Sequence, residues 1–185
     1  MKLIWVLLLM LLLAASPAAT QVPDDALIVP GLRIGKWSLD MTVDDLVRVN
    51  GQGDFSTLSH PAYVAGFTVI AWATSPLGAL TKDRKKIEAL SMTAGEFKTE
   101  KGIGVGSTRA TMIAAYGTSP VAVAVNPTTS VLVYDETGTG FSVENDRVSR
   151  VWIFRSRTGA SIWDTRRQRR PVAPPPSPGE RIDRY

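Results

Sequence analysis

The hydrophobic and polar positions of this chain follow the same order in two halves, about 64 to 66 residues apart. Each half has an amphipathic stretch that starts at Thr and stops at Gly, over residues 42–51 and 108–117. This pattern predicts a helix capped by the Thr hydroxyl and ended by glycine. Each half later has an Asp-Arg turn signal followed by an alternating strand pattern, at 83–92 and 146–156. The chain is therefore predicted to contain two copies of one supersecondary unit, neither able to bury a core alone.

Alternating and β-branched patterns predict the strands of the two units. The expected strands are a lead-in strand at 28–34, then 63–73 and 86–92 in the first unit, and 130–134, 140–144 and 148–155 in the second. Residues 52–60 are predicted to form a loop, and Ser75–Gly78 a turn. In the last strand, Trp152 and Phe154 are expected on one face and Val151 and Ile153 on the other.

The recurrent order is a helix followed by a meander of two or three strands. It predicts an α+β domain with one antiparallel sheet, continuous across units at about 31–96 and 97–158, and with the helices on one face. Residues 20–159 are expected to form this duplicated domain.

The first 19 residues are typical of an export signal. Lys2 precedes an unbroken apolar run, Leu3–Leu13, and a stretch of small residues, Ala14–Ala19. The run is shorter than the roughly 20 apolar residues of a membrane span. We expect cleavage near Ala18 or Ala19 and a periplasmic or secreted protein, with a retained anchor as the alternative. No Cys follows the run, so no lipid-bearing N-terminal Cys is present.

Composition narrows the chemistry. The chain has no Cys and a 44% apolar fraction, so the fold must be held by packing, and thiol catalysis and thiolate metal sites are excluded. The formal net charge of +4 is uneven. From Arg155 onward the chain carries eight Arg and three acids, whereas residues 19–154 are mildly acidic.

Residues 160–185 form an Arg/Pro-rich tail that is expected to be disordered, apart from Ile162 and Trp163, which are apolar enough to pack on the domain. Arg166, Arg167, Arg169 and Arg170 form its cationic cluster. Outside the cytoplasm, such a cluster suits anionic lipid headgroups, lipopolysaccharide or cell-wall polymers. The alternative is a solubilising tail without a partner. Nucleic acid is not expected, because no aromatic side chains are interleaved with the arginines.

Several motifs suggest chemistry, but each has a simpler structural explanation. The glycines of Lys101–Thr108 lack the Lys placement of a phosphate-binding loop, and a tight loop before a capped helix explains them. His60 is the only histidine of the sequence, whereas hydrolytic triads and zinc sites need further ligands or bases. The acid pairs Asp44–Asp45 and Asp135–Glu136 lie at a helix start and beside a turn, where acids are locally favoured. No metal or cofactor is predicted.

Trp72 and Trp152 lie in predicted strands, at roughly corresponding places in the two units. Exposed aromatic side chains on a sheet often anchor a partner, and core packing is their commoner fate. Both are candidates for partner binding, and at least one is expected in the core.

The second helix and its surroundings also resemble a known signature. The residues concerned are Gly104–Thr108, Ile113, Tyr116, Gly117 and Pro120, and the first unit repeats them more loosely at Met41, Thr42, Val47 and Gly51. The pattern resembles that of β-lactamase-inhibitor-protein-like domains, which the small outer-membrane-assembly lipoproteins of Gram-negative bacteria share. The resemblance covers about residues 31–157 and implies a protein-binding or envelope-associated module with no active site. Thr111 stands where an acid is usual, the lipid-bearing Cys is missing, and no inhibitory loop can be matched.

The sequence thus predicts an exported, non-enzymatic module that binds an envelope protein, with its tail attached to an anionic surface. One alternative is an exported enzyme that uses a carboxylate such as Asp135 or Glu136. Another is a structural domain with a solubilising tail.

Overall fold

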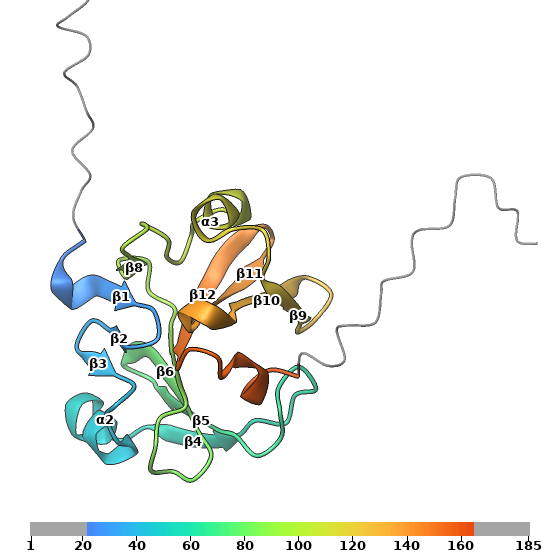
Figure 1. Cartoon of the computed structure of the whole chain (residues 1–185). Helices are drawn as coiled ribbons and strands as arrows, with labels where there is room; N and C mark the ends of the chain where they lie inside the picture. The colour runs from blue at the N-terminus through green and yellow to red at the C-terminus, as the bar shows by residue number, and fades with distance from the viewer. Residues whose placement is uncertain (1–21, 165–185) are drawn as a thin grey trace, which may run out of the picture.

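An eight-stranded antiparallel sheet forms the centre of the computed structural model, which describes residues 22–164 (Figure 1). The first unit supplies α2 (Val43–Asn50), β4 (Asp54–Thr57), β5 (Thr68–Trp72), β6 (Ser75–Thr81) and β7 (Ala89–Met92). The second supplies α3 (Arg109–Tyr116), β9 (Val121–Ala124), β10 (Thr129–Tyr134), β11 (Thr139–Glu144) and β12 (Arg147–Phe154). The predicted α+β class with an antiparallel sheet that spans both units is confirmed, but the structure contains two sheets rather than the single sheet predicted.

The strand order shows how the two units meet. The order is β4-β5-β6-β7-β12-β11-β10-β9, so the last strands of the two units pair at the centre and their first strands form the edges. At the centre, β7 pairs β12 antiparallel, with Met92 opposite Val151 and Ala89 opposite Phe154. Each unit is one helix followed by four strands rather than the two or three predicted.

Three strands of the main sheet were not predicted, and neither were β3 (Trp37–Ser38) and β8 (Lys98–Thr99) outside it. β4 and β9 are edge strands, and neither shows the polar and apolar alternation that marks a strand in the sequence: β4 has mostly exposed side chains, and the Val-Ala-Val-Ala sequence of β9 is apolar throughout although its burial alternates. β6 contains Pro76 and Gly78, which we interpreted as a turn. Its pairing with β7 begins only at Leu77, so the missing N–H of Pro76 interrupts no ladder. A Cβ atom at Gly78 would lie 2.7 Å from Ser91 Oγ, so any larger residue at this position would have to displace the Ser91 hydroxyl.

A second, smaller sheet lies beside the main one, in the order β3-β2-β1-β8. Its strands are β1 (Leu27–Val29), β2 (Arg33–Ile34), β3 (Trp37–Ser38) and β8 (Lys98–Thr99). The pairing of β1 with β8 is parallel and joins the start of the first unit to the start of the second. Short 3-10 turns at η2 (Asp24–Ala26), η3 (Asp135–Thr137) and η4 (Gly159–Ser161) complete the elements. Among the described residues, no helix has the length and apolar character needed to cross a membrane.

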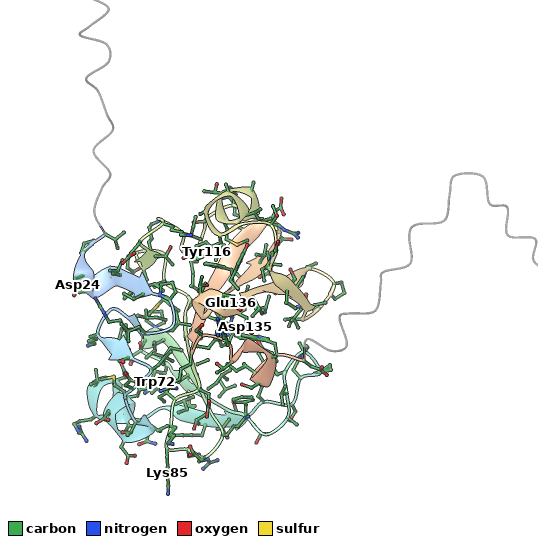
Figure 2. All side chains as sticks on the ribbon, viewed as in Figure 1. Asp24, Trp72, Lys85, Tyr116, Asp135 and Glu136 are labelled. Atoms are coloured by element: carbon green, nitrogen blue, oxygen red, sulfur yellow. The ribbon has the colours of Figure 1, made fainter. Side chains whose placement is uncertain are left out.

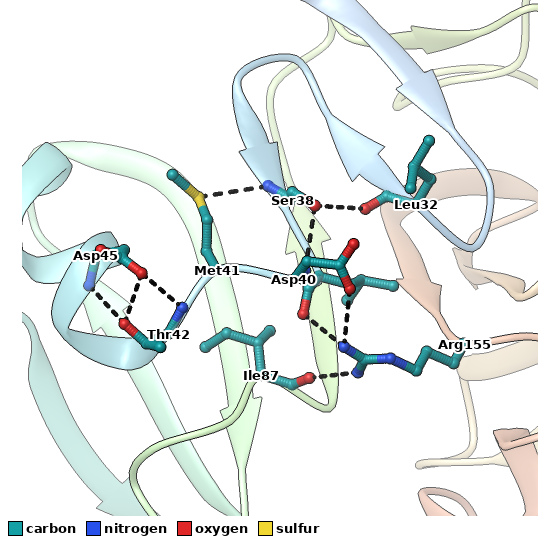
Figure 3. Close-up of polar contacts among 9 residues, drawn as sticks. Leu32, Ser38, Asp40, Met41, Thr42, Asp45, Ile87 and Arg155 are labelled. Atoms are coloured by element: carbon teal, nitrogen blue, oxygen red, sulfur yellow. Dashed lines mark hydrogen bonds and ion pairs between the residues drawn. The ribbon is translucent and has the colours of Figure 1, made fainter.

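Both helices have the predicted caps. Thr42 Oγ1 accepts a hydrogen bond from Asp45 N at 3.1 Å, and the Asp45 carboxylate accepts one from Thr42 N at 3.0 Å, which is a reciprocal capping box (Figure 3). In α3, Thr108 Oγ1 accepts from Thr111 N at 3.1 Å without the reciprocal bond. Gly51 and Gly117 follow the helices with φ of 82° and 96°, values that favour glycine.

The buried side chains form two clusters. The cluster that we call the main core contains Leu46 of α2 and Met112 of α3, together with Val151 and Ile153 of β12. The cluster that we call the second core contains Trp152 and Phe154 of the same strand and no helical residue. The predicted sorting of β12 into two faces is confirmed, because Val151 and Ile153 lie in the main core and Trp152 and Phe154 in the second core.

Arg155, just beyond β12, ties the end of the second unit to the first (Figure 3). Its guanidinium donates to Ile87 O at 2.9 Å and to Leu39 O at 2.8 Å, and it forms an ion pair with Asp40 at 3.3 Å. Carbonyls that precede α2 and β7 are thereby satisfied by one side chain.

The second core is covered by two segments without counterpart in the repeat. One is the loop 58–67 between β4 and β5, which contributes Phe67 and Ala62. The other is the chain after β12, where Ile162 and Trp163 are 1% and 0% exposed. Asp164 N donates to Ala62 O at 3.0 Å, so the two segments lie side by side (Figure 1). The folded part of the chain therefore continues beyond residue 159, where we placed the end of the domain.

Candidate functional site

A groove of about 240 Å³ opens on the second-core side of the sheet, over β5, β6, β7 and β12. Small side chains account for it. Ala71, Gly78 and Ser91 lie at neighbouring positions of three adjacent strands, with Gly78 opposite both Ala71 and Ser91. Because these side chains are short, they leave a depression in the sheet surface beside the bulky aromatic residues of the second core.

An aromatic cluster forms one wall of the groove. The ring centroids of Tyr63 and Trp152 are 6.3 Å apart, and Trp163 packs edge-to-face on Trp152 at 5.8 Å. The Trp152 indole N–H donates to Ser142 Oγ at 2.9 Å, which fixes the ring across β11. The wall is therefore held by packing on one side and by a hydrogen bond on the other.

Arg150 supplies the positive charge of the groove. It is exposed, its Cζ lies 5.3 Å from the centroid of the Trp152 ring, and it lines the groove with Tyr63. Within residues 22–164 it forms no ion pair. A guanidinium held over an aromatic ring keeps its N–H donors available for an incoming carboxylate.

Tyr63 is the half-buried titratable group of this site. Burial raises its pKa above the ordinary value of 10.0, because the phenolate is poorly solvated there. The positive charge of Arg150 and the neighbouring Trp163 N–H oppose this shift. The indole nitrogen of Trp163 is buried and makes no hydrogen bond of good geometry within the described residues. Tyr63 is thus a neutral hydrogen-bonding group in the groove below about pH 10.

The two tryptophans that we predicted as partner-binding residues are both buried, at 5% exposed for Trp72 and 4% for Trp152. Trp72 also borders the groove, but it belongs to the main core and donates from Nε1 to Gly51 O at 2.8 Å, just after α2. Trp152 belongs to the second core and lines the groove. Our expectation that they occupy corresponding places is wrong, since β5 is the second strand of its unit and β12 the fourth.

The remaining predicted site residues, Arg166, Arg167, Arg169 and Arg170, lie outside the described residues, as does the predicted export signal at 1–19. The binding role of the arginine cluster therefore stays a prediction.

The carboxylates of the alternative enzyme hypothesis are engaged elsewhere (Figure 2). Asp135 Oδ1 accepts from Gly159 N at 2.7 Å, and exposed Glu136 pairs with Arg157 at 3.1 Å. Asp45 serves the capping box, and its hydrogen bonds from Thr42 lower its pKa below the usual 3.8. Neither acid pair lines the groove, and residues 22–164 contain no group of three metal-ligating side chains.

The other motifs have structural positions. His60 Nδ1 accepts from Ala62 N at 3.1 Å within the loop 58–67. In the glycine-rich segment, a Cβ at Gly104 would lie 2.3 Å from Phe97 O, while Gly102 and Gly106 have φ of 74° and 89°. These glycines are required by a tight loop before α3, as we expected.

Sequence reasoning missed Tyr63, Arg150 and Ser91 as lining residues. One signal was present for Arg150, because it stands two positions before Trp152 and so lies on the same face of one strand. No local signal marks Ser91 or Tyr63, which reach the groove through sheet pairing and loop folding.

Comparisons with protein-family models, with curated proteins and with solved structures find no match to this chain.

Proposed function

We propose that this protein is an exported, non-enzymatic binding module whose groove holds a segment of an envelope protein, while residues 165–185 attach it to an anionic surface. The groove beside Tyr63, Arg150 and Trp152 carries this proposal. In keeping with the resemblance noted above, we assign the chain to the tandem-repeat, non-lipidated type of β-lactamase-inhibitor-protein-like domain, with both helices on one face of the sheet.

The lining suggests the chemistry of the bound segment. The floor consists of small side chains, one wall is aromatic, and the exposed cation at the rim has no carboxylate partner among the described residues. A segment with an apolar side chain for the floor and an Asp or Glu for Arg150 complements both features. The two contacts are separate, so the acidic residue sets orientation and the apolar residue supplies most of the binding free energy.

The rigidity of the site favours binding of a preformed shape. The floor lies in the sheet, and the wall is fixed by Trp163 and by the hydrogen bond from Trp152 to Ser142. A partner therefore pays little to order this side of the interface.

The alternative of an exported enzyme has less support. Asp135 and Glu136 lie on the 3-10 turn η3, one bound to a backbone N–H and the other in an exposed ion pair. Neither is placed where the groove would present a substrate.

Site-directed photocrosslinking tests the proposal. A photoreactive amino acid is placed at Ala71, an exposed groove position, and as a matched control at Ala122, an exposed alanine of edge strand β9. We expect a crosslinked envelope protein from position 71 and none from position 122.

A charge variant sharpens this test. Arg150→Gln is expected to reduce the crosslink at position 71 at least fivefold, whereas Arg109→Gln, at an exposed position of α3, leaves it unchanged. Equal crosslinking from positions 71 and 122, or an unchanged yield in Arg150→Gln, would reject the groove as the binding site. The crosslinking should be repeated on a chain that ends at Asp164. An earlier end would remove Ile162 and Trp163 from the second core.

A further inference from the structure

The connection between β6 and β7 projects from the domain with four positive side chains. Lys82, Arg84, Lys85 and Lys86 are all exposed, and we call residues 82–86 the basic loop. Figure 2 shows Lys85 extending away from the body of the molecule. Within residues 22–164, none of the four forms an ion pair.

The acid within the basic loop is occupied by the backbone. Asp83 Oδ1 accepts from the N–H groups of Lys85 and Lys86, both at 2.9 Å. These two hydrogen bonds, led by that of Lys86, lower the pKa of Asp83 below 3.8. Asp83 thus stabilises the turn, in which Arg84 has a φ of 57°. With four cations and one acid, the loop has a net charge of +3.

Aromatic rings rather than carboxylates support two of the cations. Lys82 Nζ lies 4.8 Å from the centroid of the Phe67 ring, and Arg84 Cζ lies 5.3 Å from that of Phe55. These rings orient the side chains without neutralising them. The cations are therefore held in place with their charge uncompensated.

The rest of the described domain has the opposite sign. Residues 22–164 contain 14 Lys and Arg against 15 Asp and Glu, so the part outside the basic loop carries −4. A domain with one cationic pole and an acidic remainder is both attracted and oriented by an anionic surface. This attraction acts within the Debye length of about 8 to 10 Å at physiological salt.

We infer that the basic loop binds the anionic headgroups of a lipid bilayer and so orients the folded domain on it. Three of its four cations are lysines, whose compact, strongly hydrated charges suit a diffuse array of phosphates better than a single carboxylate site. Figure 2 shows Lys85 at the tip of the loop pointing away from the domain, as expected for a surface contact.

The basic loop is linked to the second core. Phe67, under Lys82, belongs to the second core together with Trp163, and Asp164 N bonds to Ala62 O of the loop that carries Phe67. The inference goes beyond the proposed function, since it gives the folded domain a surface contact that the tail does not supply.

Vesicle sedimentation of the chain from residue 20 to 185 tests the inference. The vesicles contain 30% phosphatidylglycerol in phosphatidylcholine (about one anionic headgroup in three), with pure phosphatidylcholine as the uncharged control. The variant Lys85→Gln/Lys86→Gln leaves the backbone bonds of Asp83 in place. Its matched control, Lys36→Gln/Lys101→Gln, removes two exposed lysines from other parts of the surface.

We expect the loop variant to lower the partition coefficient about 25-fold, from roughly fivefold per lysine near an anionic surface. The control variant should change it less than threefold, and the difference should vanish in 0.5 M NaCl. Unchanged circular dichroism of both variants verifies that the fold is kept.

Equal losses in the two variants would overturn the inference, because net charge alone would then explain binding. Unchanged binding of the loop variant would assign attachment to residues 165–185 and also overturn it. So would binding of the wild type to soluble polyphosphate without binding to vesicles. Arg150→Gln should change vesicle binding by less than threefold, and the loop variant should keep the crosslink at position 71. The vesicle assay therefore tests the basic loop, and the crosslink tests the groove of the proposed function.

Discussion

The two sides of the central sheet are closed by different kinds of structure. The main core receives one helix from each unit, since α2 and α3 contribute Leu46 and Met112 from equivalent positions, and the small sheet adds Ile28, Ile34 and Trp37. The second core is closed by segments that occur once, the loop 58–67 and residues 159–164. In the second unit, the connection equivalent to loop 58–67 spans only 125–128.

This difference explains where the groove lies. Each of the two units contributes one helix to the main core. The second core, in contrast, is covered by segments that occur only once in the chain. Where those segments end, the small side chains of β5, β6 and β7 remain uncovered and form the groove. The groove therefore lies where no segment covers this side of the sheet.

The largest effect on stability is expected in residues 159–164, which cover the second core. Trp163→Ala removes a fully buried indole that packs edge-to-face on Trp152 and Phe154, with centroids 5.8 and 4.9 Å away. We expect a loss of about 3 to 5 kcal/mol in the free energy of unfolding, measured by urea denaturation. A chain that ends at Asp164 should keep the wild-type stability. A loss below about 1 kcal/mol for Trp163→Ala would show that the second core does not depend on its unique cover.

The repeated side offers a matched pair. Leu46→Ala in α2 and Met112→Ala in α3 both empty a position that is 0% exposed in the main core. Each should lower the free energy of unfolding by about 2 to 5 kcal/mol, because a buried side chain is lost and a cavity remains. Urea denaturation of the two single variants and the double variant checks this. Values that differ by more than about 2 kcal/mol would show that the two units contribute unequally to one core.

The smallest effect concerns the caps. Thr42→Ala and Thr108→Ala should each cost about 1 kcal/mol, with the larger loss at Thr42, where the bond is reciprocal.

The pH dependence of the two caps should differ. Since the folded-state pKa of Asp45 is lowered, its contribution is present above the ordinary value of 3.8 and is lost as pH falls through the folded-state pKa. Thermal unfolding between pH 5 and pH 2.5 should therefore show less acid sensitivity in Thr42→Ala than in Thr108→Ala. Equal acid sensitivity in both variants would contradict the role given to the capping box.

Local signals predicted part of this fold accurately. The helices, their Thr caps and Gly stops follow from the composition of single turns. The Asn145–Asp146 hairpin follows from residues that tolerate positive φ, here 48° and 63°. Edge strand β4 was missed because it is mostly exposed, and β9 because its Val-Ala-Val-Ala sequence has no polar position to mark the alternation. β6 was missed because Pro76 and Gly78 are tolerated there by the pairing of neighbours.

The candidate site was less predictable. Trp152 was proposed from sequence and does line the groove, but as a buried wall rather than an exposed anchor. Trp72 was proposed on the same grounds and lies in the main core. Aromatic residues in strands give the same sequence signal on either side of a sheet, so only the assembled structure separates the two.

By itself, the sequence determined the two capped helices, the hairpin and the two-faced character of β12, because these depend on neighbours within a few positions. Only the tertiary structure decided which face of β12 lies in which core and that Tyr63 and Trp163 come together over the sheet. The physical reason is that burial depends on contacts between segments far apart in the chain. The bridge between Tyr63 and Trp163 closes the second core and leaves the groove beside it.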